Sequence, residues 1–331
     1  MADHGATSNA ILWQSVVRDD LEAVETRLRR EVVSIIPTIT HLGEHVLGAG
    51  GKRLRPAVLC LAGRASGDPP ADRLVALATA VELLHMATLV HDDVVDEAGT
   101  RRGRPSANAL YGNTVTVLTG DYLLARAVRL IAHDGDLEMI RAVSDASLLL
   151  AEGEVLQLLH IGRVDVTAQD YFEVTRRKTG ALLEVCCEVG ARCAGASEDA
   201  RSALKAFGHA MGMAFQIADD ILDYLGDPAR TGKPTGGDLL EGKLTLPLIY
   251  ALNASPPAPR QHMTDRLLAG VCADDVPDVC DFIIRYGGFD RARVRAAELA
   301  ESAERRLSCL PDSAAADALR QLARYMVSRD A

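Results

Sequence analysis

"DRLVALATAVELLHMATLVHDDVVDE", residues 72–97, is the clearest indication of the fold class, because it runs for about seven helical turns without a glycine or a proline. Apolar side chains lie on nearly every side of this segment, which predicts a helix in the interior of a bundle. Four further segments show helical periodicity, at 114–133, 137–160, 170–194 and 199–225. Strand signals are scarce, and aromatic residues, which favour strands, make up only 4% of the chain. The sequence therefore predicts an all-α fold in the form of a helical bundle.

The 331 residues are expected to form one large domain. The breaks between the predicted helices are short, and none is polar enough to serve as an interdomain linker. They fall at 66–70, 98–105, 226–243 and 254–259. No repeat of solenoid period occurs, so we expect a single domain over residues 11–331 after a disordered N-terminus at residues 1–10.

Composition and charge narrow the classes of function. A formal net charge of −10 argues against a general nucleic-acid-binding protein, because affinity for the phosphate backbone depends on clustered lysine and arginine. The seven cysteines form no CxxC pair, so neither a zinc site nor a disulfide framework is indicated. The first residues lack the features of a signal peptide, and no uninterrupted apolar run of about 18 residues occurs. We therefore expect a cytoplasmic protein without a transmembrane segment.

Two acidic clusters with the spacing DDxxD lie on two different predicted helices. They are Asp92, Asp93 and Asp96 in the first cluster and Asp219, Asp220 and Asp223 in the second. The outer two aspartates of each cluster are four residues apart, which places their carboxylates on one helix face about 5–6 Å apart. Like charges at this distance repel each other more strongly as the local dielectric falls. Both clusters therefore indicate binding sites for cations.

The donor atoms of the clusters favour Mg²⁺, which prefers oxygen ligands, keeps several waters and completes its shell with phosphate oxygens. His85 and His91 lie near the first cluster, so a transition metal is a second reading. A third reading treats the clusters as solvated helix ends, and a single DDxxD would favour it. Two clusters on apolar helices, each followed by a basic loop, instead favour several Mg²⁺ ions in one active site.

Basic residues accompany both acidic clusters. They gather in "GGKRLRP" at 50–56, in "RRGR" after the first cluster, in "RRKTG" and in the loop after the second cluster. The members are Lys52, Arg53, Arg55, Arg101, Arg102, Arg104, Lys178, Lys233 and Lys243. Each alone is more typical of a solvated surface. Together with the acidic clusters they indicate two phosphate groups, one bound through Mg²⁺ and one bound by lysine and arginine alone.

Over nearly its whole length the chain resembles the trans-isoprenyl (polyprenyl) diphosphate synthases. The resemblance rests on motifs that occur in the family's order. They are "GAGGKRLRP", "ELLHMATLVHDDVVDEAGTRRGRPSAN", "GDYLLARA", "GEVLQL", "KTGALLE", "FQIADDILDYLGD" and "TGKPTGGDLLEGKLTLPLIYAL". The resemblance implies an all-helical isoprenoid-synthase bundle with a central apolar cavity, and a homodimer. It also implies an enzyme that condenses isopentenyl diphosphate head to tail with an allylic diphosphate such as farnesyl diphosphate, giving an all-trans polyprenyl diphosphate.

The same resemblance implies roles for individual residues. Asp92, Asp96, Asp219 and Asp223 would hold Mg²⁺ on the allylic diphosphate, with support from Asp93 and Asp220. The allylic diphosphate or its pocket would be contacted by Arg101, Lys178, Thr179, Gln216, Lys233 and Lys243. Isopentenyl diphosphate would be bound by Lys52, Arg55, His85 and Arg102. Lys178 and the four metal-binding aspartates are the candidate catalytic residues.

Product length is expected to depend on the helix that precedes the first acidic cluster. The growing tail would pass side chains one, two and three turns earlier, which are Ala87 and Thr88, then Leu84, then Val81. Short-chain relatives carry a bulky aromatic near the first of these positions, whereas residues 81–91 contain no aromatic. The pattern is most similar to the long-chain octaprenyl-type synthases that make quinone side chains. The alternative is ordinary core packing of small residues.

Three other functions remain open. A short-chain synthase of the farnesyl or geranylgeranyl type would keep every motif. A terpene cyclase shares the fold and the first cluster, but it generally has a different second metal motif and no need of "GGKRLRP". A non-catalytic subunit of a heteromeric synthase tends to lose aspartates, and none is missing here.

Overall fold

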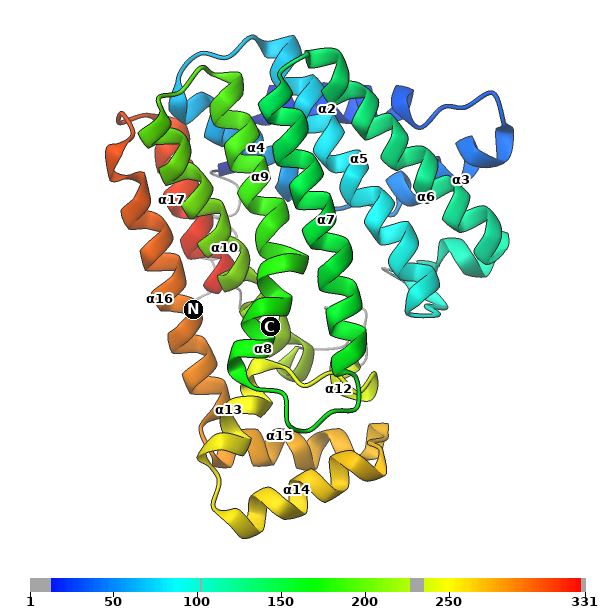
Figure 1. Cartoon of the computed structure of the whole chain (residues 1–331), viewed down its shortest axis with the longest axis vertical. Helices are drawn as coiled ribbons and strands as arrows, with labels where there is room; N and C mark the ends of the chain where they lie inside the picture. The colour runs from blue at the N-terminus through cyan, green and yellow to red at the C-terminus, as the bar shows by residue number, and fades with distance from the viewer. Residues whose placement is uncertain (1–12, 102, 227–234, 329–331) are drawn as a thin grey trace, which may run out of the picture. The chain divides into compact units, whose positions relative to one another are not determined.

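The computed structural model describes residues 13–101, 103–226 and 235–328. This part of the chain is almost entirely helical (Figure 1), and its only sheet joins two short antiparallel strands. β1 (Thr100–Arg101) pairs with β2 (Arg104–Pro105) in the loop after the first acidic cluster. The prediction of an all-α fold is therefore confirmed.

Packing divides the described chain into two compact units. Within the described ranges, unit 1 consists of residues 13–144, 185–205 and 309–319, and unit 2 of residues 145–184, 206–308 and 320–328. The boundary falls within α7 (Leu137–His160), α9 (Ala181–Cys193), α10 (Glu198–Leu225) and α17 (Ala314–Val327). The single domain over residues 11–331 stays a prediction, and the N-terminus predicted to be disordered, residues 1–10, lies outside the described residues.

The centre of unit 1 is α5 (Ala71–Val95), which corresponds to the helix predicted over 72–97. It packs against α2 (Arg18–Glu31), α3 (Pro37–Gly48), α4 (Leu54–Ser66) and α6 (Ala107–Asp134), and α6 runs along it (Figure 1). Among the described helices, α5 alone is long and apolar enough to cross a membrane, but 67% of its most apolar stretch is buried inside the structure. Such burial is typical of a core helix.

α6 begins earlier than the helix predicted over 114–133, at Ala107. Gly112 lies within it at φ 75° and ψ 159°, a conformation that only glycine adopts readily. The glycine interrupts the helical backbone, so the first turns of α6 lack the continuous periodicity from which the helix was predicted.

Gly120 marks a close approach of α6 to the end of α5. A Cβ added at this position would lie 2.3 Å from Nε2 of His91. The same Nε2 lies 3.2 Å from the carbonyl oxygen of Val117 and 3.3 Å from Oδ1 of Asp121. Gly120 therefore makes room for the side chain that directly precedes Asp92.

Replacing Gly120 with alanine is expected to lower the free energy of unfolding by about 1–3 kcal/mol, because the methyl group would overlap the imidazole ring. Urea unfolding followed by circular dichroism measures the loss. Gly99→Ala is the matched control, since an added Cβ there meets nothing within 4 Å. It should change the stability by less than about 0.5 kcal/mol. Equal stabilities of the two variants would contradict the close contact.

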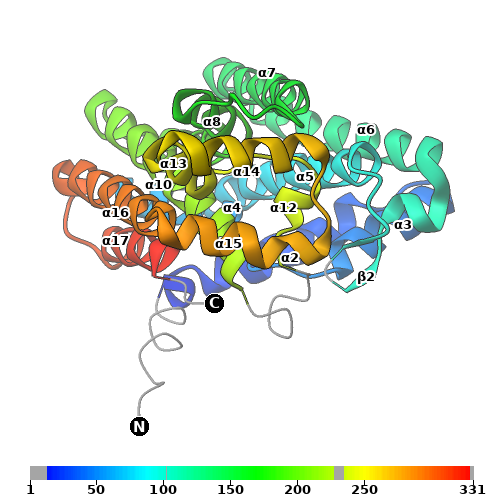
Figure 2. The same ribbon diagram turned by 90° about the horizontal axis from the view of Figure 1, so that it is seen from below.

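Shorter helices make up the rest of unit 2. They are α8 (Ala168–Thr175), η1 (Arg176–Gly180), α12 (Gly237–Leu240), α13 (Leu246–Ala254), α14 (Pro257–Ala269), η2 (Ala273–Asp275), α15 (Val276–Arg285) and α16 (Gly288–Arg306), with η3 (Leu307–Cys309) following α16. Figure 2 shows α13 with α14 and α15, against which it packs.

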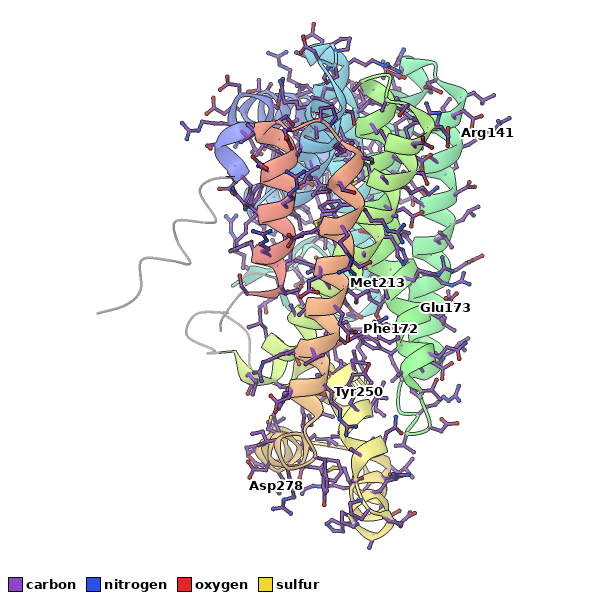
Figure 3. All side chains as sticks on the ribbon, turned by 90° about the vertical axis from the view of Figure 1, so that its left-hand side faces the viewer. Arg141, Phe172, Glu173, Met213, Tyr250 and Asp278 are labelled. Carbon is purple, nitrogen blue, oxygen red and sulfur yellow. The ribbon has the colours of Figure 1, made fainter. Side chains whose placement is uncertain are left out.

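The apolar core of unit 2 positions the second acidic cluster. Ile217 and Ile221 of α10 belong to the same buried cluster as Leu239 of α12 and residues of α13, α15 and α16. Phe172 and Tyr250, labelled in Figure 3, are partly buried against this core. The acidic end of α10 and the short helix α12 are therefore held together by packing as well as by hydrogen bonds.

Candidate functional site

The first acidic cluster lies at the C-terminal end of α5. The helix ends at Val95, yet the N–H of Asp96 still donates to the carbonyl oxygen of Asp92 at 2.8 Å. The i, i+4 spacing of the two outer aspartates therefore persists to the end of the helix, with Asp92 half-buried and Asp96 exposed. Because a helix C-terminus carries partial negative charge, carboxylates gathered there are unfavourable without cations nearby.

The middle aspartate of this cluster, Asp93, is turned into the protein and is only 2% exposed. Arg101 Nε donates to its Oδ1, and the N–H of Ala107 donates to its Oδ2 at 3.4 Å. Asp93 therefore ties the loop that follows α5 to the end of that helix. Arg101, which was predicted to contact the allylic diphosphate, is ion-paired with Asp93 in this structure.

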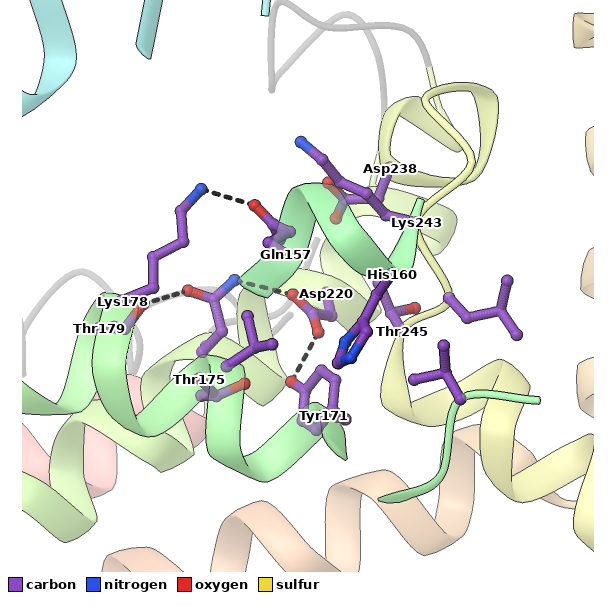
Figure 4. A pocket seen from close by; sticks show the side chains of 14 residues that line it. Gln157, His160, Tyr171, Thr175, Lys178, Thr179, Asp220, Asp238, Lys243 and Thr245 are labelled. Carbon is purple, nitrogen blue, oxygen red and sulfur yellow. Dashed lines mark hydrogen bonds between the residues drawn. The ribbon is translucent and has the colours of Figure 1, made fainter. Parts of the chain in front are cut away.

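The second cluster lies in the last turns of α10, and here too the middle aspartate is buried more deeply than the outer two. Asp220 is buried, whereas Asp219 and Asp223 are half-buried. Tyr171 Oη donates to Oδ2 of Asp220 at 2.6 Å, and Gln216 Nε2 donates to Oδ1 at 2.8 Å (Figure 4). Burial raises the pKa of Asp220 and that of Tyr171 well above their ordinary values.

In both clusters, then, protein groups hold the middle aspartate, and the outer two share a helix face. The outer pairs offer two carboxylates each. Among the residues that the structure describes, no group of three or more His, Cys, Asp and Glu side chains forms a metal centre made of protein ligands alone. A cation at either outer pair would take its remaining ligands from water or from a substrate.

A π-helix interrupts the helix predicted over 170–194 and carries the "KTG" motif. It is η1, between α8 and α9. Lys178 Nζ donates to Oε2 of Glu154 and to Oε1 of Gln157, each at 2.7 Å. Single π turns inside α-helices are frequent at functional sites. Here the π turn brings Lys178 to two polar partners on α7.

Two glycines let the neighbouring helices approach η1 closely. A Cβ added at Gly153 of α7 would lie 2.9 Å from the backbone nitrogen of Lys178. A Cβ added at Gly212 of α10 would lie 2.9 Å from Cα of Gly180. The motifs "GEVLQL" and "KTGALLE" therefore meet in unit 2. Glu154 and Gln157 were not predicted as partners of Lys178, although their i, i+3 spacing beside a glycine on one helix was a usable signal.

A cavity of about 140 Å³ in unit 2 collects several of the predicted side chains (Figure 4). Lys178, Thr179, Gln216 and Lys243 line it, and Thr179 Oγ1 donates to Oε1 of Gln216 at 2.7 Å. Polar lining residues that were not predicted are Gln157, His160, Tyr171, Thr175, Asp238 and Thr245. Asp238 connects the cavity to the second acidic cluster, because its N–H donates to Oδ2 of Asp223 at 3.1 Å.

Three of the four residues predicted to bind isopentenyl diphosphate are described by the structure, and they lie in unit 1. Lys52 is exposed two residues before the start of α4, and Arg55 is half-buried in the first turn of that helix. A helix N-terminus favours anions because its first N–H groups lack partners within the helix. His85 is half-buried on α5. Arg102 and Lys233, the remaining predicted contacts, lie outside the described residues.

The predicted tunnel residues all lie on α5. Val81, Leu84 and Ala87 are buried, with at most 3% of each residue exposed, and Thr88 is half-buried. Thr88 Oγ1 donates to the carbonyl oxygen of His85 at 2.8 Å, which leaves its methyl group as an apolar surface. Their role in guiding a product tail stays a prediction.

Comparisons with known proteins agree with these features. Residues 36–281 match the family described as polyprenyl synthetase. Octaprenyl diphosphate synthase of Escherichia coli is 37% identical over 311 residues, covering 94% of this chain and 96% of the relative. Heptaprenyl diphosphate synthase component 2 of Geobacillus stearothermophilus is 38% identical over 323 residues, covering 96% and 98%.

A solved structure confirms the fold. The polyprenyl synthase from Caulobacter crescentus, crystallised with calcium and isoprenyl diphosphate, superposes with a TM-score of 0.92 at 36% identity. The match covers 97% of this chain and 98% of that one. The predicted isoprenoid-synthase type of helical bundle is therefore confirmed, and the chain belongs to the polyprenyl synthetase family of prenyltransferases.

Proposed function

We propose that this chain is a Mg²⁺-dependent enzyme that condenses isopentenyl diphosphate head to tail with an allylic diphosphate, giving an all-trans polyprenyl diphosphate. The observation that carries the proposal is that the aspartates of each acidic cluster differ in their contacts. The buried middle aspartate is held by protein groups at the helix end, and the two outer aspartates share one helix face. The calcium and isoprenyl diphosphate bound to the Caulobacter crescentus relative support a divalent cation and a diphosphate as ligands here.

The donor set fits Mg²⁺. Asp92 with Asp96, and Asp219 with Asp223, offer only oxygen atoms, two carboxylates from each helix. Mg²⁺ is typically bound through one or two carboxylates, with waters and substrate phosphates completing its shell. When bound, it would neutralise negative charge that develops on a departing diphosphate. The buried middle aspartates hold the two helix ends in place for this purpose.

The chain's own cations would share this work. Lys178, which Glu154 and Gln157 orient, and Lys243 would add positive charge near the allylic diphosphate. As the bond from the allylic carbon to the diphosphate breaks, the electron pair of the isopentenyl double bond forms the new carbon–carbon bond. A proton is then lost, and the released diphosphate is the base we propose for it. Fixed charges placed where charge develops, together with the proximity of the two substrates, lower the barrier.

A long-chain product, such as one for a quinone side chain, is the outcome we propose. The octaprenyl diphosphate synthase of Escherichia coli supports it, as do the small side chains of Ala87 and Thr88 one turn before the first cluster. Farnesyl diphosphate is the proposed primer. The alternative is a short-chain synthase, in which a bulky side chain close to the first acidic cluster would block the tunnel and stop elongation early.

A homodimer in the cytoplasm is the proposed assembly. Val117 and Val128 lie within about 20° of each other around α6, and Leu118 lies about 100° from Val117. They are exposed apolar side chains, with 38%, 53% and 60% exposure for Val117, Val128 and Leu118. Exposed apolar side chains at helical spacing mark association surfaces. The relative named as component 2 of a heptaprenyl synthase keeps a heteromeric complex as the second reading.

Replacing Leu118 with glutamate is expected to weaken self-association by at least about tenfold, because a charge would be buried in the apolar interface. Light scattering after size-exclusion chromatography, over a range of concentrations, measures the change. Val294→Glu is the matched control, since Val294 is 59% exposed on α16. A wild-type monomer, or a Leu118→Glu dimer of unchanged affinity, would refute this interface.

The proposed activity is tested by incubating the purified protein with Mg²⁺, labelled isopentenyl diphosphate and farnesyl diphosphate. The products are then dephosphorylated and sized by mass spectrometry. A ladder that ends in long polyprenols is the expected result. An end at geranylgeraniol would keep the chemistry and refute the long product. Cyclic hydrocarbons would identify a terpene cyclase, and turnover only with a second protein would identify a heteromeric subunit.

A further inference from the structure

Arg53, in the middle of the motif "GGKRLRP", has an unusual backbone conformation. It directly precedes α4 and lies at φ 47° and ψ 43°, in the left-handed region. Residues other than glycine seldom adopt this region, and they persist there only when surrounding contacts hold them. Glycine would adopt this conformation without strain, so we expect contacts of the arginine side chain to stabilise the turn.

The Arg53 side chain makes three hydrogen bonds that hold this conformation. Its Nη1 donates to Oε1 of Glu82 at 3.0 Å, and its Nε donates to Oε2 of Glu25 at 3.0 Å. Its Nη2 donates to the carbonyl oxygen of Leu47 at 3.2 Å. One guanidinium thus connects the start of α4 to α2, α3 and α5. The side chain is only 14% exposed, so it faces the protein rather than a ligand.

Glu82 is the more buried of the two carboxylate partners, with 5% of its side chain exposed against 33% for Glu25. It lies on α5 three residues before His85, so the two side chains share one side of that helix. Arg55 lies in the first turn of α4, two residues after Arg53. Burial is the main cause that raises the pKa of the Cys186 thiol to about 12. The charge of Arg55 lowers the pKa of this thiol, whereas the charge of Glu82 raises it.

We propose that Arg53 and Glu82 are a positioning pair for the isopentenyl diphosphate site. Their ion pair fixes the start of α4, which carries Lys52 and Arg55, against the part of α5 that carries His85. The left-handed turn directs the side chain of Arg53 inward, and the anion would be contacted by Lys52, one residue before it, and Arg55, two residues after it. The inference rests on the proposed function, because it takes isopentenyl diphosphate as the ligand of those three side chains.

The pair is tested by steady-state kinetics in which each substrate is varied separately. Glu82→Gln, which keeps the shape and removes the charge, should raise KM for isopentenyl diphosphate about 10- to 100-fold. KM for the allylic diphosphate should change less than about twofold, since Glu82 holds only the isopentenyl side. Glu82→Asp, which keeps the carboxylate, should restore part of the loss. A merely structural role would change stability without separating the two KM values.

Two variants of Arg53 separate the ion pair from the backbone conformation. Arg53→Gly relieves the left-handed strain and removes the side chain, whereas Arg53→Lys keeps a charge without the planar fork that joins three partners. Both should raise KM for isopentenyl diphosphate. If Arg53→Gly binds isopentenyl diphosphate as the wild type does, the turn alone is sufficient and the proposal is overturned. If Glu82→Gln does not fold, the two Arg53 variants still test whether the Arg53–Glu82 ion pair is needed to bind isopentenyl diphosphate.

A second ion pair of unit 1, between half-buried Arg64 and buried Asp20, is the matched control. Arg64 donates to both carboxylate oxygens of Asp20 at 2.6 Å and joins α4 to α2, away from the predicted ligands. Asp20→Asn should lower the melting temperature and leave both KM values unchanged. An equal rise of KM for isopentenyl diphosphate in Asp20→Asn would show a general loss of stability and overturn the proposal.

Calorimetric binding of isopentenyl diphosphate without an allylic substrate separates the two levels of inference. Wild-type protein that neither binds nor consumes isopentenyl diphosphate refutes the proposed function, and the positioning pair with it. Wild-type protein that binds it while Glu82→Gln and Arg53→Lys bind equally well refutes the positioning pair alone. Wild-type binding that weakens about 10- to 100-fold in both variants, but not in Asp20→Asn, is the expected result.

Discussion

Asp92→Ala is expected to abolish measurable turnover, and Asp92→Asn to lower kcat by about 100-fold or more. Asp92 is a half-buried outer aspartate at the end of α5, and its carboxylate is one of the two that share a helix face there. Asparagine keeps the size of the side chain but removes the negative charge that attracts a cation. Incorporation of labelled isopentenyl diphosphate, measured over a range of Mg²⁺ concentrations, gives both kcat and the Mg²⁺ requirement.

Two other aspartates of α5 serve as controls. Asp72 is exposed in the first turn, at the opposite end of the helix, and Asp72→Asn should leave kcat within about twofold of the wild type. Asp93→Asn removes the partner of Arg101 and should mainly lower stability, because a half-buried guanidinium loses its carboxylate. Near-normal turnover by Asp92→Ala would contradict the metal assignment at this cluster.

Long helices were predictable from the sequence because their apolar periodicity extends over many turns. The segment 137–160 matches α7, and the segment 199–225 begins one residue after α10 does. The two DDxxD clusters were predictable for the same reason, since their geometry is set by the helix that carries them. Helix α6 was foreseen only in part, because its first turns depend on the conformation of Gly112.

The partners of the site residues were not predictable, since they come from contacts between helices far apart in the chain. The π turn at η1 leaves no mark on apolar periodicity, so the segment 170–194 read as one continuous helix. Tyr171 lies 49 positions before Asp220, and nothing local in the sequence marks it as that carboxylate's hydrogen-bond donor. Arg53 was counted among the anion-binding cations, whereas its side chain is occupied by Glu25 and Glu82.

Ala87→Phe is expected to shorten the products, because the ring would stand about one turn from Asp92, where a growing tail would pass. Thr88→Phe is the companion variant. Thr88, Leu84 and Val81 lie within about 60° of one another around α5, with Ala87 about 100° from Thr88, so the pair covers both edges of the predicted path. Mass spectrometry of the dephosphorylated products gives the chain-length distribution.

The size of the effect should depend on depth along α5 and on the side of the helix that carries the ring. Val81→Phe places the ring two turns deeper and should permit longer products than Thr88→Phe does.

Leu89→Phe is the control, because Leu89 lies about 160° from Ala87 and lines a different small cavity with His45. An aromatic ring added in a packed helix destabilises the protein by about 1–3 kcal/mol on any side. Lost stability should therefore accompany all four variants, whereas a shift to shorter products should accompany only those on the predicted path. A similar shift in Leu89→Phe would attribute the change to altered packing and refute the tunnel along this face of α5.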